Sequence, residues 1–458
     1  MGVSTYLFYD IETTGLNKCF DQVLQFAAIR TDKKLKEIER HAIQVKLNCD
    51  IIPAPQAVMT HRIGVEQFSQ GVNELDAIQK IHTLLNTPNT ISVGYNSLGF
   101  DDEFLRFSFY RNLFPPYTHQ YANGCGRMDI YPITLLYYLF KPNHLLWPTQ
   151  NGSVNLKLEN LNTGNQLFKG QAHNAMVDVE ITLALAKKLF ANKTMWDFVS
   201  GYFEKKSDEA RIANNTIGLM VNGKIGFQSH FIAPVIHLGQ HQHYKNQSVW
   251  LRLDDDNLRK TAANTDIVLT TKIIKKRLAE PPIFLPLKDR YLDLLSDERK
   301  KSVADNQQWL STHPEILKKI TDYYQHEKYK LIPERDVDAA LYDIGFATPQ
   351  EENLFKQFHA AKPTDKESIA KRFPNKIRQM QALRIIARHF PEVLSQDAKI
   401  EFDMYLQSTP IDFRGEKKLT KEGALFNIEE LLNNASLDSE QQGLLKELKG
   451  FIQHAGGR

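Results

Sequence analysis

Runs of apolar side chains in the N-terminal part of the chain predict a group of β-strands. Residues 5–11 (TYLFYDI) are rich in aromatic and branched side chains, which favour strands. Residues 22–31 and 37–47 have the same character, and the short turns between the three segments predict an antiparallel meander. A shorter apolar run over residues 90–95 indicates a further, buried strand.

Helical spacing of apolar residues follows over residues 75–85, 101–113 and 174–190. In the third segment Asn174 is a good N-cap, and it precedes one apolar stripe, formed by Val179, Leu183, Ala186 and Phe190. Strands first, and then alternating helices and strands, are typical of a mixed α/β domain. We expect this domain to end near residue 193.

After residue 193 the pattern of apolar and polar residues changes twice along the chain. Residues 212–253 contain short strand-like pieces separated by glycine and polar turns, which indicates a small β-rich domain. Residues 290–330 have a charged helical pattern, and the sequence from Gln350 onward is helical almost throughout. We therefore predict three domains, over residues 1–193, 194–349 and 350–458.

The composition bears on which partners the protein can bind and on where in the cell it is expected. The 458 residues include 57 basic and 54 acidic side chains, with a formal net charge of +3, so a nucleic-acid partner would need a local basic cluster. The three cysteines form no Cys-x-x-Cys pair, which fits a reducing compartment and argues against a thiolate zinc site. No apolar run of about 18 residues occurs, so we expect no membrane span and a cytoplasmic location.

The first candidate for chemistry is Asp10-Ile11-Glu12, at the end of the first predicted strand. Side chains two apart on a strand share a face, so the two carboxylates repel unless a divalent cation such as Mg²⁺ or Mn²⁺ lies between them. Thr13, Thr14 and Gly15 then permit a tight turn, and Leu16 is an apolar side chain suited to act as a wedge. A solvated strand end with two exposed acids is the alternative interpretation.

Two further motifs carry acids at the starts of predicted helices. The stretch from Asn96 to Asp101 precedes one helix, and Asp101 either caps that helix or joins Asp10 across the sheet. His173 comes before the next helix, and Asp178 lies within its first turns. An acid near a helix N-terminus is also favoured by the helix dipole alone, and a loop histidine is often only hydrogen-bonded.

The order Asp-x-Glu, Asp and His-x₄-Asp resembles the DEDDh family of exonucleases, whose ribonuclease H-like fold carries these motifs. All five residues are present: Asp10, Glu12, Asp101, His173 and Asp178. Segments 25–32, 94–103, 337–342 and 387–391 are similar to bacterial members that act on single-stranded DNA. This resemblance implies an α/β exonuclease domain with a mixed sheet, a small SH3-like β-rich domain and an α-helical C-terminal domain.

The resemblance also implies chemistry with two divalent ions, Mg²⁺ with Mn²⁺ as a substitute. Two ions roughly 4 Å apart can supply most of what phosphodiester hydrolysis needs. We expect Asp10 to bridge both ions, Glu12 and Asp178 to complete the site of the attacking water, and Asp101 to help hold the second ion. His173 would be the general base. Which carboxylate binds which ion is left open.

Binding of a single strand calls for cations along the phosphates and aromatic faces for the bases. Residues 104–127 supply both, although Phe104 and Phe107 are expected in the core. The expected DNA contacts are Glu12, Thr13, Gly15, Leu16, Asn96, Arg106, Tyr117, Tyr121, Lys157 and Gln171. Leu135 is apolar where the family can carry an arginine on the DNA path. A basic cluster, Lys272, Lys275, Lys276 and Arg277, either lines this path or forms a solvated face.

The expected activity is 3′-to-5′ degradation of single-stranded DNA to 5′-mononucleotides, in DNA repair and recombination, by a monomer. The family further implies docking to the acidic C-terminal tail of single-stranded DNA-binding protein. The alternatives are an RNA-trimming exonuclease and a non-catalytic single-stranded DNA-binding adaptor. The long C-terminal half argues against the first, and the intact acids at 10, 12, 101 and 178 argue against the second.

Overall fold

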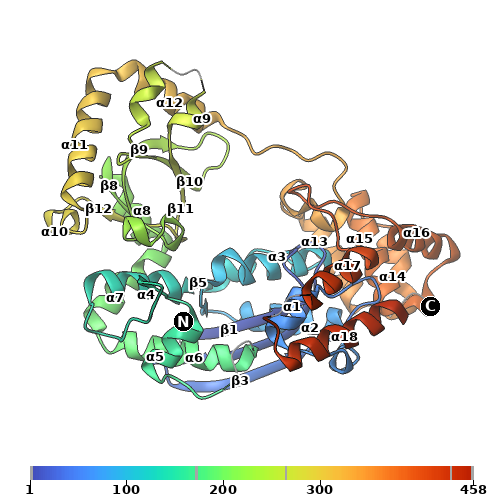
Figure 1. Ribbon diagram of the computed structural model, residues 1–458. Coiled ribbons are helices and arrows are strands. Elements are labelled where there is room, and N and C mark those ends of the chain that lie inside the picture. The colour runs from blue at the N-terminus through green and yellow to red at the C-terminus, as the bar shows by residue number, and fades with distance from the viewer. Residues whose placement is uncertain (1–3, 171–173, 264–265, 434–435, 455–458) are drawn as a thin grey trace. The chain divides into compact units, whose positions relative to one another are not determined.

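The computed structural model describes residues 4–170, 174–263, 266–433 and 436–454 (Figure 1). The chain divides into two compact units. The first unit combines residues 1–127, 168–183 and 331–458, and the second combines 128–167 and 184–330. The first unit is therefore assembled from segments far apart in the sequence.

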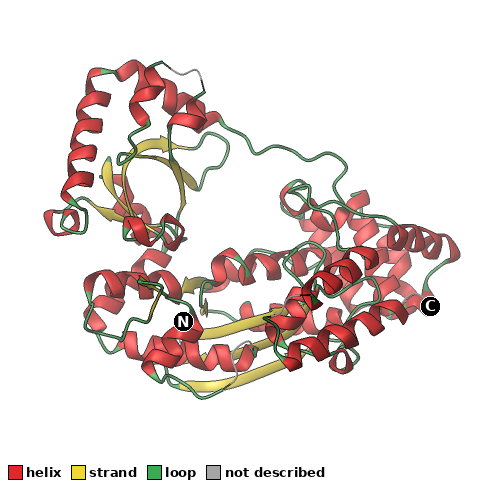
Figure 2. Ribbon diagram, in the orientation of Figure 1, coloured by secondary structure: helices red, strands yellow, loops and turns green. Residues whose placement is uncertain are grey.

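The first sheet, whose strands are among those drawn in yellow in Figure 2, is mixed. Its strand order is β3-β2-β1-β4-β5. Strands β1, β2 and β3 form the predicted antiparallel meander, and β4 pairs parallel to β1. The α/β fold with a mixed sheet is thus confirmed. The strand bounds are β1 Thr5–Thr13, β2 Val23–Thr31, β3 Glu37–Gln44, β4 Thr90–Gly94 and β5 Gly126–Asp129.

Helices cover this sheet at positions close to those predicted. Their bounds are α1 Pro55–His61, α2 Glu74–Leu85, α3 Asp101–Arg111 and α6 Ala175–Phe190, with single 3₁₀ turns η1 Val65–Gln67, η2 Ser97–Gly99, η3 Thr118–Gln120 and η4 Ala122–Gly124. Ile78 and Ile81 of α2 and Phe104 of α3 pack against Leu7 and Ile11 of β1 in one core. Phe104 and Phe107 are both buried, as expected.

The C-terminal segment of the first unit is helical, as predicted. Its elements are η9 Val337–Tyr342, α13 Pro349–Ala360, α14 Pro363–Ala370, α15 Lys376–His389, η10 Pro391–Val393, α16 Gln396–Gln407, α17 Lys421–Leu432 and α18 Ser439–His454. Ile428 of α17 and Leu445 and Leu448 of α18 share a core with Leu24 and Val58. The C-terminal helices therefore pack directly on the N-terminal meander.

The second unit contains a five-stranded antiparallel sheet in the order β11-β10-β9-β8-β12. Its elements are α4 Ile130–Phe140, β6 Thr149–Gln150, β7 Ser153–Val154, α5 Leu158–Asn165, α7 Lys193–Ser200, η5 Gly201–Phe203, α8 Lys205–Ala213, β8 Ile217–Val221, η6 Gly223–Ile225, η7 Phe227–Ser229, β9 Ile232–Gln240, β10 Gln247–Arg252, η8 Leu258–Ala262, α9 Ile267–Thr270, β11 Ile273–Arg277, β12 Ile283–Pro286, α10 Asp289–Leu292, α11 Asp297–Thr312 and α12 Pro314–His326. The β-rich character of 212–253 is confirmed, whereas its description as SH3-like stays a prediction, as do the three domain boundaries.

The basic cluster of β11 does not form one solvated or DNA-facing surface. The ammonium of Lys276, which is only 1% exposed, donates to Asp208 Oδ2 at 2.5 Å and to the carbonyls of Arg277 and Glu280 at 2.7 Å. A role for Lys276 along a DNA path is therefore wrong, because its charge is neutralised inside the unit. Lys275 is paired with Glu327 at 2.9 Å.

Within the described ranges, no helix has both the length and the apolarity needed to cross a bilayer.

Candidate active site

Three acids from two elements meet at the end of β1. Asp10 and Glu12 lie on the same face of β1, and Asp178 lies in the first turn of α6. One carboxylate oxygen from each lies within 4.8 Å of the others. Asp101 opens α3, and its charge acts on both Asp10 and Glu12. The structure therefore brings together the four acids that the sequence singled out.

Electrostatics in this cluster fit a cation site. Burial, and then the charges of Asp101, Glu12 and Asp178, raise the pKa of Asp10 well above its usual value. Burial and the charges of Asp178 and Asp101 raise the pKa of Glu12 to about 9. Without a positive charge among them, these carboxylates cannot all stay ionised near neutral pH. An all-oxygen donor set of this kind suits hard divalent cations, so the residues fit the metal that the motif implies.

A tight turn follows Glu12 and exposes one apolar side chain. Thr13 Oγ1 donates to the Gly15 carbonyl at 2.8 Å, and Thr14 Oγ1 donates to Asp21 Oδ1 at 2.9 Å. A Cβ on Gly15 would lie 2.4 Å from Asp21 Oδ2, so only glycine allows this close approach. Leu16 is 79% exposed, which leaves it free to contact a base.

Asp102, next to Asp101, is a fully buried acid that contacts three basic side chains. Its carboxylate accepts from His119 Nε2 at 3.0 Å and Arg127 Nη1 at 2.7 Å, and pairs with Arg106 Nε at 3.4 Å. Burial alone would raise the pKa of Asp102, but Arg127, His119 and Arg106 hold it well below its usual value. The signal available in the sequence was an acid four residues before an arginine on a helix.

Asp102→Asn will lower the free energy of unfolding by about 2 kcal/mol, because Arg127 and Arg106 then lose the charge that compensates their burial. Urea denaturation measures this change. The matched control is Asp76→Asn, at an exposed acid in the first turn of α2, for which we expect little effect. Equal losses for the two variants would contradict this role of Asp102.

The expected DNA contacts fall in different surroundings. The Arg106 guanidinium is largely buried and lies 5.8 Å from the Tyr117 ring centroid, whereas Tyr121 is well exposed. Asn96 adopts a left-handed conformation (φ 57°) just before η2. Lys157 belongs to the second unit, where it precedes α5. Gln171 and His173 lie outside the described residues, so their predicted roles stay predictions.

Sequence reasoning missed the role of two aromatic residues, one at the end of η9 and one shortly after it. Phe346 makes an edge contact with Tyr117 at 5.6 Å between ring centroids, and Tyr342 donates from its hydroxyl to Glu103 Oε1 at 2.6 Å. Phe346 is largely exposed and Tyr342 is about half-exposed. Only the fold brings this segment beside α3, so the chain order contained no direct signal for it.

The mixed sheet and its acid cluster define a metal-dependent exonuclease domain. A family model described as exonuclease matches residues 7–186, and one described as exonuclease I C-terminal domain matches residues 335–455. Exodeoxyribonuclease I of Escherichia coli K12 is 28% identical over 416 residues, covering 85% of this chain and 86% of that protein. The Haemophilus influenzae protein of the same name is 26% identical, covering 97% of each chain. The chain is therefore a homologue of exodeoxyribonuclease I along nearly its whole length.

Solved structures agree with that placement. Escherichia coli exonuclease I in complex with a dT13 oligonucleotide is 25% identical with a TM-score of 0.86, over 99% of this chain and 100% of that one. A moderately thermophilic exonuclease I from Methylocaldum szegediense is 25% identical with a TM-score of 0.81, over 99% of both chains. The fold likeness therefore extends over both compact units.

Proposed function

We propose that this chain is a 3′-to-5′ exonuclease that degrades single-stranded DNA to 5′-mononucleotides. The observation that carries the proposal is the approach of Asp10, Glu12 and Asp178 to within 4.8 Å on an exonuclease fold. The full-length relatives are named exodeoxyribonuclease I, and solved relatives hold single-stranded oligonucleotides. The mutual repulsion of these acids opposes folding, and a non-catalytic adaptor would gain nothing from them in return.

The reaction is hydrolysis of the last phosphodiester bond. Two divalent ions, Mg²⁺ with Mn²⁺ as a substitute, would supply a nucleophilic water at neutral pH and neutralise charge on the phosphate. Asp10 would contribute to holding both ions, Glu12 and Asp178 would complete the site where the attacking water binds, and Asp101 would help to hold the second ion. His173 accepts the proton of that water. As the water oxygen bonds to phosphorus, the bond from phosphorus to the 3′ oxygen of the preceding nucleotide breaks. That oxygen takes up a proton from solvent and becomes the new 3′ hydroxyl, and a 5′-mononucleotide is released.

The strand is held by two groups of residues. Backbone and side chains of the turn after β1 (Thr13, Gly15, Leu16), together with Glu12 and Asn96, contact the 3′-terminal nucleotide. Arg106, Tyr117, Tyr121, Lys157 and Gln171 follow the phosphates and bases further along. The exposed ring of Tyr121 and the exposed side chain of Leu16 support stacking on bases.

Removing divalent cations will abolish the activity, because the carboxylates alone cannot neutralise the phosphate. We expect 3′-labelled single-stranded DNA to lose its label in Mg²⁺, to keep it in EDTA, and to lose it again when Mg²⁺ or Mn²⁺ is restored. Matched RNA and duplex DNA serve as comparison substrates. Faster cleavage of RNA would favour the RNA-trimming alternative, and activity that persists in EDTA would refute the site.

We further propose a cytoplasmic monomer that works in DNA repair and recombination and docks the acidic, aromatic-ended tail of single-stranded DNA-binding protein. The proposed arrangement is an exonuclease domain over 1–193, an SH3-like domain with helical additions over 194–349 and a helical domain over 350–458. Sedimentation tests the monomer, and fluorescence anisotropy of a labelled tail peptide tests the docking. A dimer, or a peptide without affinity, would remove the corresponding part of this proposal.

A further inference from the structure

A chain of hydrogen bonds holds the turn that exposes Leu16. The Asn17 backbone N–H donates to Asp21 Oδ2 at 2.8 Å, and the Asp21 carboxylate also accepts from Thr14 Oγ1 at 2.9 Å. The Arg111 guanidinium in turn donates to the Asp21 carbonyl at 2.7 Å. These contacts fix both ends of the turn, and the side chain of Asn17 points to a different part of the chain.

That partner is Asp412, which follows α16 in the C-terminal helical segment. Asn17 Nδ2 donates to Asp412 Oδ2 at 3.2 Å, across nearly the whole length of the sequence. The other oxygen, Oδ1, accepts the backbone N–H groups of Arg414 at 2.7 Å and Glu416 at 2.9 Å. Asp412 is buried, so its carboxylate is a fixed acceptor rather than a mobile surface group.

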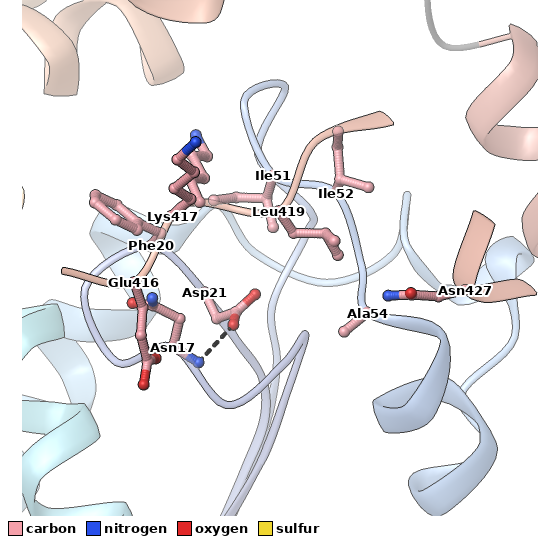
Figure 3. A pocket seen from close by; sticks show the side chains of 11 residues that line it. Asn17, Phe20, Asp21, Ile51, Ile52, Ala54, Glu416, Lys417, Leu419 and Asn427 are labelled. Carbon is pink, nitrogen blue, oxygen red and sulfur yellow. Dashed lines mark hydrogen bonds between the residues drawn. The ribbon is translucent and has the colours of Figure 1, made fainter. Parts of the chain in front are cut away.

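Packing holds the residues just after this turn, where Cys19 and Phe20 share a core with Phe413, but it leaves a space beside Asn17. A pocket of about 180 Å³ lies beside the turn, with Asn17 and Asp21 on its wall and Glu416, Lys417 and Leu419 contributed by the C-terminal segment (Figure 3). Where side chains do not fill the space between two segments, a directional polar contact determines their spacing. The Asn17–Asp412 hydrogen bond is such a contact at this pocket.

We propose that Asp412 is a positioning residue that acts through Asn17 on the turn carrying Leu16, so that the C-terminal segment helps to place the 3′-terminal nucleotide. This inference rests on the proposed function, in which Leu16 contacts that nucleotide. A small displacement of a positioning element is enough to cost a large factor in rate. The strand contacts further from the 3′ end do not depend on this turn.

The test measures kcat and KM on 3′-labelled single-stranded DNA for Asn17→Ala, Asp412→Ala, Leu16→Ala and the double variant Leu16→Ala/Asn17→Ala. We expect each single variant to lower kcat about tenfold and to leave KM nearly unchanged. The double variant should be no slower than the slower single variant, because both changes remove the same contact. A merely structural role would give effects that multiply, since the exposed Leu16 side chain adds little to folding.

The control is Asn427→Ala, which changes the same pocket from α17 but lies outside the hydrogen-bond chain, and which should keep wild-type kinetics. If Asp412→Ala does not fold, Asn17→Ala carries the test, because it leaves the Asp412 turn intact. Multiplying effects, wild-type kcat in Asn17→Ala, or wild-type kcat in Leu16→Ala would each overturn the inference. If wild type itself leaves single-stranded DNA intact, the proposed function fails instead.

Discussion

Asp10→Asn will lower kcat for 3′-end hydrolysis of single-stranded DNA by roughly 10³-fold or more. Oxygens of Asp10, Glu12 and Asp178 lie within 4.8 Å of one another, so the loss of Asp10 removes a ligand from the centre of the proposed chemistry. Divalent ions are worth several kcal/mol of transition-state stabilisation, and each 1.36 kcal/mol is a factor of about ten. Single-turnover cleavage of 3′-labelled DNA in Mg²⁺ measures the loss.

The same variant should stabilise the metal-free protein. Burial and the charges of Asp101, Glu12 and Asp178 raise the pKa of Asp10, so its ionised form opposes folding at neutral pH, and a neutral amide relieves that opposition. Thermal unfolding in EDTA should therefore occur at a higher temperature in Asp10→Asn than in wild type. The control is Asp305→Asn, at a half-exposed acid of α11, which should change neither quantity. Full activity in Asp10→Asn would remove Asp10 from the site.

Arg388→Met will lower the free energy of unfolding of the first unit by about 3–5 kcal/mol, the largest stability effect that we expect. Arg388 Nη2 donates to Asp50 Oδ2 at 2.9 Å and to Asp338 Oδ2 at 3.0 Å, and all three side chains are buried. The substitution leaves two buried carboxylates without their shared partner. Urea denaturation is the measurement, with the exposed Lys371→Met as control.

The pH dependence of this effect follows from Asp50. Burial would raise its pKa, but Arg388 and Lys418 lower it far below the usual value. A carboxyl group whose folded-state pKa is depressed contributes stability that is present above its unfolded pKa, about 3.9, and is lost only as the pH falls through the folded value. In Arg388→Met the burial of Asp50 is opposed mainly by Lys418, so the pKa of Asp50 rises in the variant, and the difference between wild type and Arg388→Met should be larger at pH 8 than at pH 5. A difference that vanishes at neutral pH would contradict this account.

Local sequence patterns predicted the strands and helices that carry the acids. Strand alternation and helix caps depend only on residues that are close together in the sequence. The meander, α2, α3 and α6 follow from such patterns, and so do the positions of Asp10, Glu12, Asp101 and Asp178 at element ends. The expectation that Lys276 lines a DNA path was wrong, although a local pattern could have corrected it. Strand alternation turns Lys276 to the inside of the sheet while Lys275 and Arg277 face outward, and this periodicity could have been applied.

Other features depend on partners that no local pattern indicates. The carboxylate of Asp102 needs His119 from η3 and Arg127 from β5. The Asn17–Asp412 contact joins residues that are far apart in sequence, and both members are ordinary polar side chains. The packing of the segments decides which distant polar groups pair. The sequence alone therefore indicates polar residues that could form contacts, but not the residues that they contact.

The three-segment composition of the first unit has a consequence for synthesis on the ribosome. Asp50 finds its partners Arg388, Tyr405 and Lys418 only after the chain has been translated past residue 418. Until then, the turn beside the acids lacks Asp412 as well. A nascent chain should therefore acquire full activity late, which would protect nearby single-stranded DNA from unfinished or prematurely terminated copies.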